Sequence, residues 1–169
     1  DVIPPTIVPP PTEPTLVVLQ QGDLSNNGDK LLLKGTEGID IIEISVTSAW
    51  ITIQANDTTF KQMRDATASL QVDALSGTDK IRITIDDSDV KAIISPEEFN
   101  IIAQGISISG NDFSQTSVTT QGENGQVTFL DTPGNDQLTA SPGIAVLETN
   151  QARLEAIGFE TFTASAIHG

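Results

Sequence analysis

The sequence lacks several residue types, and each absence excludes a class of chemistry. Cysteine is missing from all 169 residues, which rules out disulfide bonds, thiolate metal sites and cysteine nucleophiles. Aromatic residues make up 4% of the chain and tyrosine is absent, so aliphatic side chains must supply most of the core. Only 8 basic residues stand against 23 acidic ones. The net charge of −15 argues against binding to nucleic acid or to an anionic membrane surface, because both need a basic footprint.

Long apolar runs are missing as well. No run approaches the roughly 18 residues that a membrane-spanning helix requires, so we expect no membrane insertion. The first residues, Asp1 to Pro5, are neither basic nor followed by an apolar segment, so they do not resemble a signal peptide. A mature or excised fragment of a longer protein would begin in this way. The acidity itself fits two interpretations: solubility of a secreted protein, or oxygen ligands for calcium.

Proline is concentrated at the beginning of the chain. Six of the nine prolines lie in residues 1–15. Because proline fixes φ and removes a backbone donor, this stretch should be an extended polyproline II linker. The alternative is an N-terminal arm that buries Ile3, Ile7 and Val8 on a neighbouring subunit. Residues 16–169 are expected to form a single β-rich domain.

Short apolar runs alternate with clusters of Gly, Asn, Asp and Ser from residue 16 onward, which is typical of strands and turns. The alternation is clearest in Lys80–Asp86, where every second residue is isoleucine, and in Trp50–Gln54. A period of two predicts one buried and one exposed face. The predicted strands are Leu31–Lys34, Asp40–Val46, Ala49–Ala55, Ser69–Ala74, Lys80–Asp86, Val90–Ile94, Gly105–Ser109, Gln126–Asp131, Ile144–Glu148 and Thr161–Ala166.

Helix signals are weaker and predict only short segments. Ser95–Phe99 has an N-cap serine, a proline at the first helical position and two acids in the first turn. Thr149–Ile157 and Phe60–Ala66 are two further candidates.

A Gly-x-Asp turn recurs along the chain, ending at Asp40, Asp79, Asp112 and Asp136. The copies lie 39, 33 and 24 residues apart, which favours an all-β solenoid, a right-handed parallel β-helix with irregular loops. A β-sandwich is the alternative. Glycine would supply a positive φ in each turn, and aspartate would bond to the backbone two residues on. Gly169 aligns with Gly77, so we expect a fragment of a longer repeat protein with an exposed C-terminal edge.

Two resemblances follow from these turns. Gly35–Glu43 resembles the calcium-binding nonapeptide of haemolysin-type (RTX) secreted proteins, in which calcium lies between adjacent coils. The segments Phe129–Ala140 and Gly158–Ala164 are more similar to repeats in very large surface proteins of planctomycetes and similar bacteria. This second resemblance implies a β-helical, adhesin-like surface segment without enzyme activity, located outside the cell or on its surface.

Candidate sites are few. His168 is the sole histidine and lies one residue from the end, which is a poor position for a catalytic triad or a zinc site. We therefore predict no catalytic residue. Trp50, the sole tryptophan, is a candidate ligand-binding residue, either packed at an edge or stacking on a sugar. Calcium is the candidate cofactor, and its candidate ligands are Asp40, Asp79, Asp86, Asp87, Asp89, Asp112 and Asp136.

The sequence thus predicts a non-catalytic extracellular structural or adhesive module, and the partners we expect for it are copies of itself or neighbouring repeats. Two alternatives stay open. One is a carbohydrate-binding module, joined by the proline linker to an absent catalytic domain and binding a polysaccharide. The other is a calcium-dependent secreted repeat.

Overall fold

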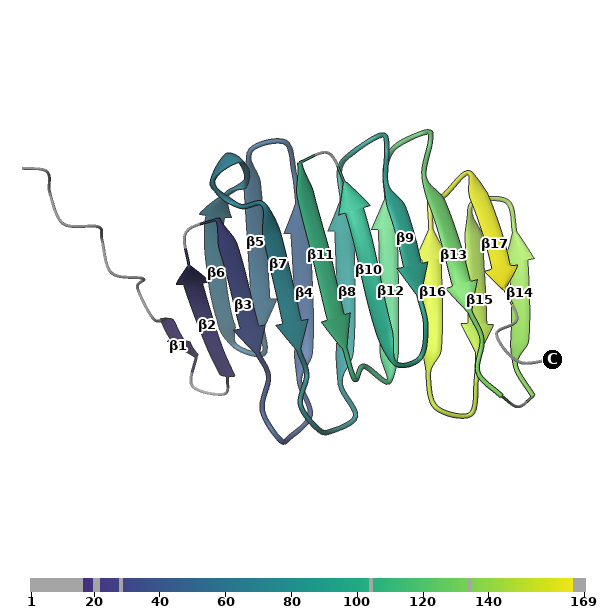
Figure 1. Cartoon of the computed structure of the whole chain (residues 1–169), viewed down its shortest axis with the longest axis horizontal. Coiled ribbons are helices and arrows are strands. Elements are labelled where there is room, and N and C mark those ends of the chain that lie inside the picture. Colours follow the sequence, from purple (N-terminus) through teal and green to yellow (C-terminus); the bar gives the residue numbers. More distant parts are fainter. Residues whose placement is uncertain (1–16, 20–21, 28, 104, 134, 166–169) are drawn as a thin grey trace, which may run out of the picture.

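The computed structural model describes residues 17–19, 22–27, 29–103, 105–133 and 135–165. The linker predicted for residues 1–15 and the predictions for His168 and Gly169 lie outside these residues. The described chain forms two β-sheets that lie face to face and run along the long axis of the molecule (Figure 1).

We call the two sheets A and B, and the strands that the described residues form in each sheet follow in spatial order. Sheet A contains β1 (Val17–Leu19), β2 (Gly22–Asn27), β3 (Lys30–Lys34), β7 (Ser69–Asp73), β11 (Ile106–Asn111), β10 (Glu98–Ala103), β9 (Lys91–Ile94), β13 (Gln126–Leu130) and β17 (Thr161–Ser165). Sheet B contains β14 (Gln137–Ser141), β15 (Ile144–Glu148), β16 (Arg153–Ile157), β12 (Gln115–Thr120), β8 (Lys80–Ile85), β4 (Ile41–Val46), β5 (Trp50–Ala55) and β6 (Thr58–Met63).

Parallel pairing between strands far apart in the sequence shows that the chain coils. In sheet A, β3, β7 and β11 are parallel neighbours, as are β9, β13 and β17. In sheet B, β4, β8, β12 and β16 form one parallel series. The chain therefore alternates between the sheets and forms a β-solenoid of about four turns, so the predicted all-β solenoid is confirmed.

Antiparallel strands interrupt this coil at three places. They are β5 with β6, β10 between β9 and β11, and β14 with β15. Equivalent positions of successive coils, Ile41, Lys80, Gln115 and Arg153, lie 39, 35 and 38 residues apart, so the coils are similar in length. The Gly-x-Asp turns are spaced unevenly because Asp112 and Asp136 do not occupy the position that Asp40 and Asp79 share.

The core lies between the sheets and is built by alternation. In β8, Ile81, Ile83 and Ile85 are buried while Lys80 and Arg82 are exposed. Each fully buried side chain of this size contributes about 1.5–3 kcal/mol to folding. Other strands of the stack continue the same ladder with isoleucine, leucine and valine, and four buried phenylalanines add to the core: Phe99 and Phe129 from strands, and Phe113 and Phe159 from turns.

The short helices predicted from the sequence are wrong. Ser95–Phe99 is a turn into β10, in which the Ser95 hydroxyl accepts from the Glu98 N–H at 3.0 Å. Most of Thr149–Ile157 is strand β16, and Phe60–Ala66 is the end of β6 followed by one 3₁₀ turn, Arg64–Ala66. Local capping signals were present, but pairing with neighbouring strands outweighs weak helix propensity.

Candidate functional site at the aspartate turns

The first two Gly-x-Asp turns stack directly on each other. Asp40 precedes β4 and Asp79 precedes β8, and these strands pair in parallel with Ile41 opposite Lys80. The Asp40 N–H donates to Asp79 Oδ1 at 2.7 Å, and the Lys80 N–H donates to the Asp40 carbonyl at 2.9 Å. Both aspartates are buried. The Asp79 carboxylate and the Asp40 carbonyl therefore each join one coil to the next.

The Asp40 carboxylate is held by donors from its own turn and from the adjacent hairpin. It accepts from the Thr36 N–H at 2.6 Å and from Asn56 Nδ2 at 2.9 Å, and the Thr36 hydroxyl lies 3.2 Å from Oδ1. A Cβ at Gly35 would lie 2.5 Å from Asp40 Oδ2 and 2.8 Å from the Ala74 carbonyl. Only glycine fits this position, so Gly35, the first residue of the nonapeptide-like segment Gly35–Glu43, makes room for the carboxylate.

Asp79 occupies a different environment. Its Oδ2 atom is buried and has no hydrogen-bond partner among the described residues. Burial raises the pKa of this carboxyl above its ordinary value. The nearby Asp40 charge raises the pKa further, while the bond from the Asp40 N–H lowers it. Gly77 has a φ of +153°, and a Cβ there would lie 2.2 Å from the Gly38 carbonyl.

The Asp40–Asp79 pair is where the resemblance to the calcium nonapeptide would place an ion, between adjacent coils. Calcium takes 6–8 oxygen ligands. The pair offers two carboxylates, of which the Asp40 group is already bonded to Thr36 and Asn56. Within the described residues, no group of three or more His, Cys, Asp or Glu side chains is arranged to hold a metal ion. The donor set therefore does not fit a calcium cage, and these aspartates act as acceptors for the backbone.

The other two Gly-x-Asp turns depart from this stack. Asp112 is exposed and itself adopts a positive φ of 66°, a role expected of the glycine. In the third coil, Ser114 takes the position of Asp79, with its hydroxyl donating to the Asp79 carbonyl at 2.8 Å. Asp136 lies at the start of the edge strand β14, and Gly134 lies outside the described residues.

Asp136 nevertheless reproduces the bond made by Asp40. It accepts from the Thr132 N–H at 2.9 Å, as Asp40 does from Thr36, again across four residues. The expected bond to the backbone two residues on is thus replaced by one to a threonine four residues earlier. Asp136 Oδ1 is buried without a hydrogen-bond partner in the described part of the chain.

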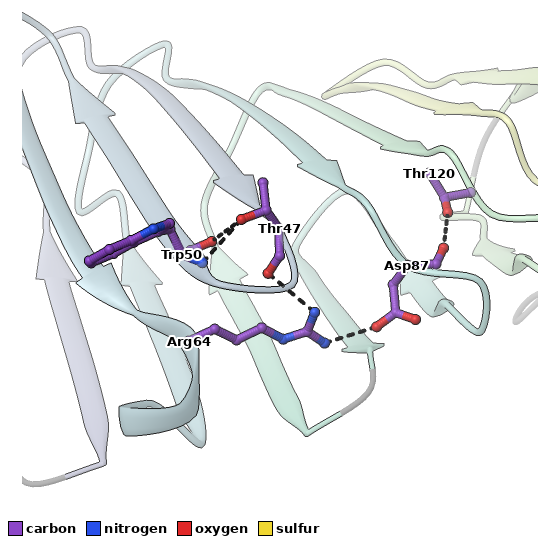
Figure 2. Close-up of polar contacts among 5 residues, drawn as sticks. All are labelled: Thr47, Trp50, Arg64, Asp87 and Thr120. Atoms are coloured by element: carbon purple, nitrogen blue, oxygen red, sulfur yellow. Dashed lines mark hydrogen bonds and ion pairs between the residues drawn. The ribbon is translucent and has the colours of Figure 1, made fainter.

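The remaining candidate metal ligands lie in the turn between β8 and β9 and do not converge. Asp86 and Asp89 are exposed. Asp87 forms a buried ion pair with Arg64, with 2.8 Å between Arg64 Nη2 and Asp87 Oδ2 (Figure 2). Arg64 also donates to the Thr47 carbonyl at 3.3 Å. Arg64 therefore ties the β4–β5 turn to the next coil, and Asp87 has a structural partner.

Two residues that hold the turns were not predicted from the sequence. Asn56 adopts a φ of 51° at the β5–β6 turn, accepts from the Ile41 N–H at 2.9 Å and donates to Asp40. The adjacent pair Asn56–Asp57 after an alternating strand was a hairpin signal that could have found it. Arg64 carried no comparable signal, because its partner lies 23 residues away.

Trp50 begins β5 on the outer face of sheet B, opposite Ile51 and Ile53, as the alternation in Trp50–Gln54 predicted. The residue is 41% exposed, and Lys61 Nζ lies 4.3 Å from the ring centroid. Met63 is its cross-strand partner and is also exposed. Figure 2 shows the ring turned away from the Arg64–Asp87 pair, so Trp50 belongs to the outer surface.

The outer face of sheet B also carries a shallow hollow of about 160 Å³ across β4, β8, β12 and β16. Charges of opposite sign line it in exposed pairs. On its lining, Arg82 lies 3.3 Å from Glu43 and Arg153 lies 3.1 Å from Glu155, and Arg153 also lies 3.6 Å from Glu148 outside the hollow. Such exposed pairs contribute about 0–1 kcal/mol each, so they balance charge on the face more than they stabilise it.

Comparison with known proteins yields no relative. No protein-family model, curated protein or solved structure matches the chain. The described residues contain no helix that is both long and apolar enough to cross a membrane.

Proposed function

We propose that this chain is a non-catalytic structural or adhesive module of an extracellular surface or secreted protein. One observation carries the proposal: three of the four Gly-x-Asp carboxylates, those of Asp40, Asp79 and Asp136, accept hydrogen bonds from the backbone of their own or a neighbouring coil. Residues that serve a reaction or a ligand would instead converge on a shared cavity. These aspartates hold the turns of the stack in place, so we infer that the stack itself carries the function.

The surface supports the same proposal. Acidic residues exceed basic ones by 15, which keeps an exposed, secreted stack soluble and discourages unspecific association. The long axis lies along the direction of stacking, so each added coil lengthens the module (Figure 1). An elongated module of this kind spans the distance between other parts of a protein or presents a sheet face to a partner.

Two measurements test the proposal together: where the chain is located, and whether it turns over a substrate. Intact cells that produce the protein are treated with a membrane-impermeant biotin reagent, and the labelled chain is recovered by affinity capture. We expect labelling at the level of a known surface protein, with a cytosolic protein as the unlabelled control. The purified chain should release no product from a panel of polysaccharides. Labelling only after lysis, or release of sugars, would contradict the proposal.

Trp50 favours carbohydrate binding as a second candidate, because an exposed indole on a flat sheet is a stacking platform for sugars. Calorimetric titration with neutral polysaccharides would test it. If a sugar stacks there, Trp50→Ala abolishes binding, while Thr119→Ala, on the outer face of β12, leaves it unchanged. Equal binding by both variants would exclude Trp50 as the platform.

A further inference from the structure

The outer face of sheet B has a second hollow, of about 220 Å³, over the neighbouring strands β5, β4 and β8. Two rows of polar side chains line it, each in register across the three strands. The row of short side chains consists of Thr52, Ser45 and Thr84. The row of longer side chains, two residues away along each strand, consists of Gln54, Glu43 and Arg82. The hollow therefore has a floor of hydroxyl groups and a wall of longer polar groups.

The lining offers hydrogen bonds that the protein itself leaves unused. The three floor hydroxyls and the Gln54 amide make no side-chain hydrogen bond to any other described residue. Glu43 and Arg82 are paired at 3.3 Å, but both side chains are at least half exposed. A guanidinium has several donors and a carboxylate several acceptor positions, so one bond between them leaves most of these free. A ligand rich in hydroxyl groups would find both donors and acceptors here.

The charges of the lining select a neutral ligand. The hollow contains one acidic and one basic side chain, Glu43 and Arg82, and their charges cancel. The whole chain has a net charge of −15, which repels polyanions at a distance. Nucleic acids and acidic polysaccharides are therefore disfavoured.

Apolar side chains do not form the floor of the hollow. Ile44 contributes to the lining, but this residue is only 2% exposed. The cores of protein–protein interfaces are enriched in aromatic side chains, so a protein partner fits this lining poorly. One aromatic ring lies nearby: Trp50 is on the same face of β5, two residues or about 7 Å along the strand from Thr52. Hydroxyl groups beside an exposed indole suit a sugar, which has polar edges and an apolar ring face.

The shape of the hollow favours a chain of sugars over a single small molecule. Pockets that enclose small molecules usually exceed about 300 Å³, and this hollow is smaller and lies on an open sheet face. The floor hydroxyls follow one another across the strands. Three strands span about 10 Å, roughly the length of two residues in an extended sugar chain.

We propose that this hollow binds a neutral, extended polysaccharide, which lies across β5, β4 and β8 along the row of floor hydroxyls. The inference rests on the proposed adhesive function and names the partner of the module. It places binding in the hollow itself, with Trp50 at its margin.

Affinity electrophoresis tests the binding directly, because the acidic chain migrates readily in native gels. The gels contain hydroxyethyl cellulose, galactomannan or arabinoxylan as neutral extended polymers, and carboxymethyl cellulose or polygalacturonate as anionic ones. We expect at least one neutral polymer to retard the chain and neither anionic polymer to do so. Retardation by no neutral polymer, or by an anionic one, would overturn the inference.

Two variants test the location of the site. Ser45→Leu raises the middle of the floor and removes its hydroxyl, and Ser109→Leu makes the same change on the outer face of sheet A. Glu43→Ala with Arg82→Ala removes the charged wall. Its matched control is Arg153→Ala with Glu155→Ala, an exposed pair that lines only the neighbouring 160 Å³ hollow.

The two variants of the hollow should bind at least about tenfold more weakly, because each loses several hydrogen bonds to the sugar, while both controls stay within about twofold of the wild type. Thermal unfolding by circular dichroism checks that each variant is folded. Wild-type binding by both variants of the hollow would overturn the inference, even if Trp50→Ala reduced binding. Loss of binding only in the Arg153 and Glu155 control would also overturn it, by placing the sugar in the smaller hollow. The surface labelling that tests the proposed function is independent of all these results.

Discussion

The middle of the stack and its C-terminal end are built from the same alternating pattern but reach different states. Strand β8 has a parallel neighbour on each side, and Ile81, Ile83 and Ile85 are at most 2% exposed. Among the described residues, strand β14 has one neighbour, β15, and all five of its own residues are exposed. The pattern sets which face a side chain occupies, whereas the neighbouring coils decide how much water it loses.

The largest effect is expected when an apolar side chain in the middle of the stack is truncated, and the matched truncation at the C-terminal end gives the comparison. Ile83→Ala should lower the free energy of unfolding by about 2–5 kcal/mol, because it leaves a cavity that neighbouring coils cannot fill. Leu138→Ala removes a side chain that is already partly hydrated, so we expect a loss below about 1 kcal/mol. Urea unfolding monitored by circular dichroism measures both. Equal losses would show that the end is as closely packed as the middle.

Two glycines with the same backbone conformation sharpen the comparison. Gly158 has a φ of +79° and Gly143 a φ of +78°. A Cβ at Gly158 would lie 2.0 Å from the Thr120 carbonyl of the preceding coil, whereas a Cβ at Gly143 would meet nothing within 4 Å. Gly158→Ala should cost about 2–4 kcal/mol, from strain and overpacking together. Gly143→Ala should cost about 1–2 kcal/mol, from the left-handed conformation alone. Thermal unfolding of both variants checks the difference, and an inverted order would contradict the close contact.

Asp40 and Asp136 each accept a hydrogen bond from the N–H of a threonine four residues earlier, Asp40 in a buried turn and Asp136 near the C-terminal end of the stack. Asp40→Ala leaves the Thr36 N–H and Asn56 Nδ2 without their acceptor in a buried turn, at a cost of about 2 kcal/mol. Asp136→Ala removes only the bonds to Thr132 near the C-terminal end, so about 1 kcal/mol is expected. Chemical denaturation of both variants measures the difference. If Asp136→Ala proves the more harmful, the end turn is doing more than its described contacts indicate.

The substitution at Asp79 is the only one expected to increase stability, and its effect is small. Because its pKa is raised above 3.8, the folded chain keeps this proton to a higher pH than the unfolded chain does. The wild type therefore loses stability as pH rises above 3.8 toward the folded pKa, and this deficit persists at neutral pH. Asp79→Asn removes the charge and should stabilise the fold at pH 7 by on the order of 1 kcal/mol, with the difference vanishing as pH falls toward 3.8.

Calcium decides how the Asp79 result is interpreted. The wild type and Asp79→Asn are unfolded in parallel with calcium and with a chelator, and the unfolding midpoints are compared. We expect no dependence of either protein on calcium. Stabilisation of the wild type alone would show that a cation occupies the Asp40–Asp79 pair after all.

Sequence reasoning succeeded where one strand carries its own signal. Every second residue of β8 is isoleucine, so its strand and buried face were predicted to within one residue. It failed for β12, whose buried positions are Thr116, Val118 and Thr120. Two of these are hydroxyl residues, so no apolar alternation marks the strand. Thr120 is buried because its hydroxyl donates to the Asp87 carbonyl of the preceding coil, a bond that only stacking creates (Figure 2).

For the candidate site, the four Gly-x-Asp turns were found from the sequence, but their roles were not. Asp40 and Asp79 are neighbours because β4 and β8 are adjacent. Asp112 is offset because Ser114 takes the equivalent position in the next coil, and Asp136 precedes the hairpin of β14 and β15. Asp87 was predicted as a metal ligand, and in the structure its carboxylate pairs with Arg64, which lies 23 residues earlier in the chain.

By itself, the sequence determined the all-β class, the faces of the clearest strands and the existence of repeated turns. These depend on residue order along one strand, since a period of two is a local property. The tertiary structure decided which turns stack, which carboxylates are satisfied and how deeply each apolar side chain is buried. Those outcomes depend on the strand that lies alongside, and strand neighbours in a solenoid come from a full coil away in the sequence.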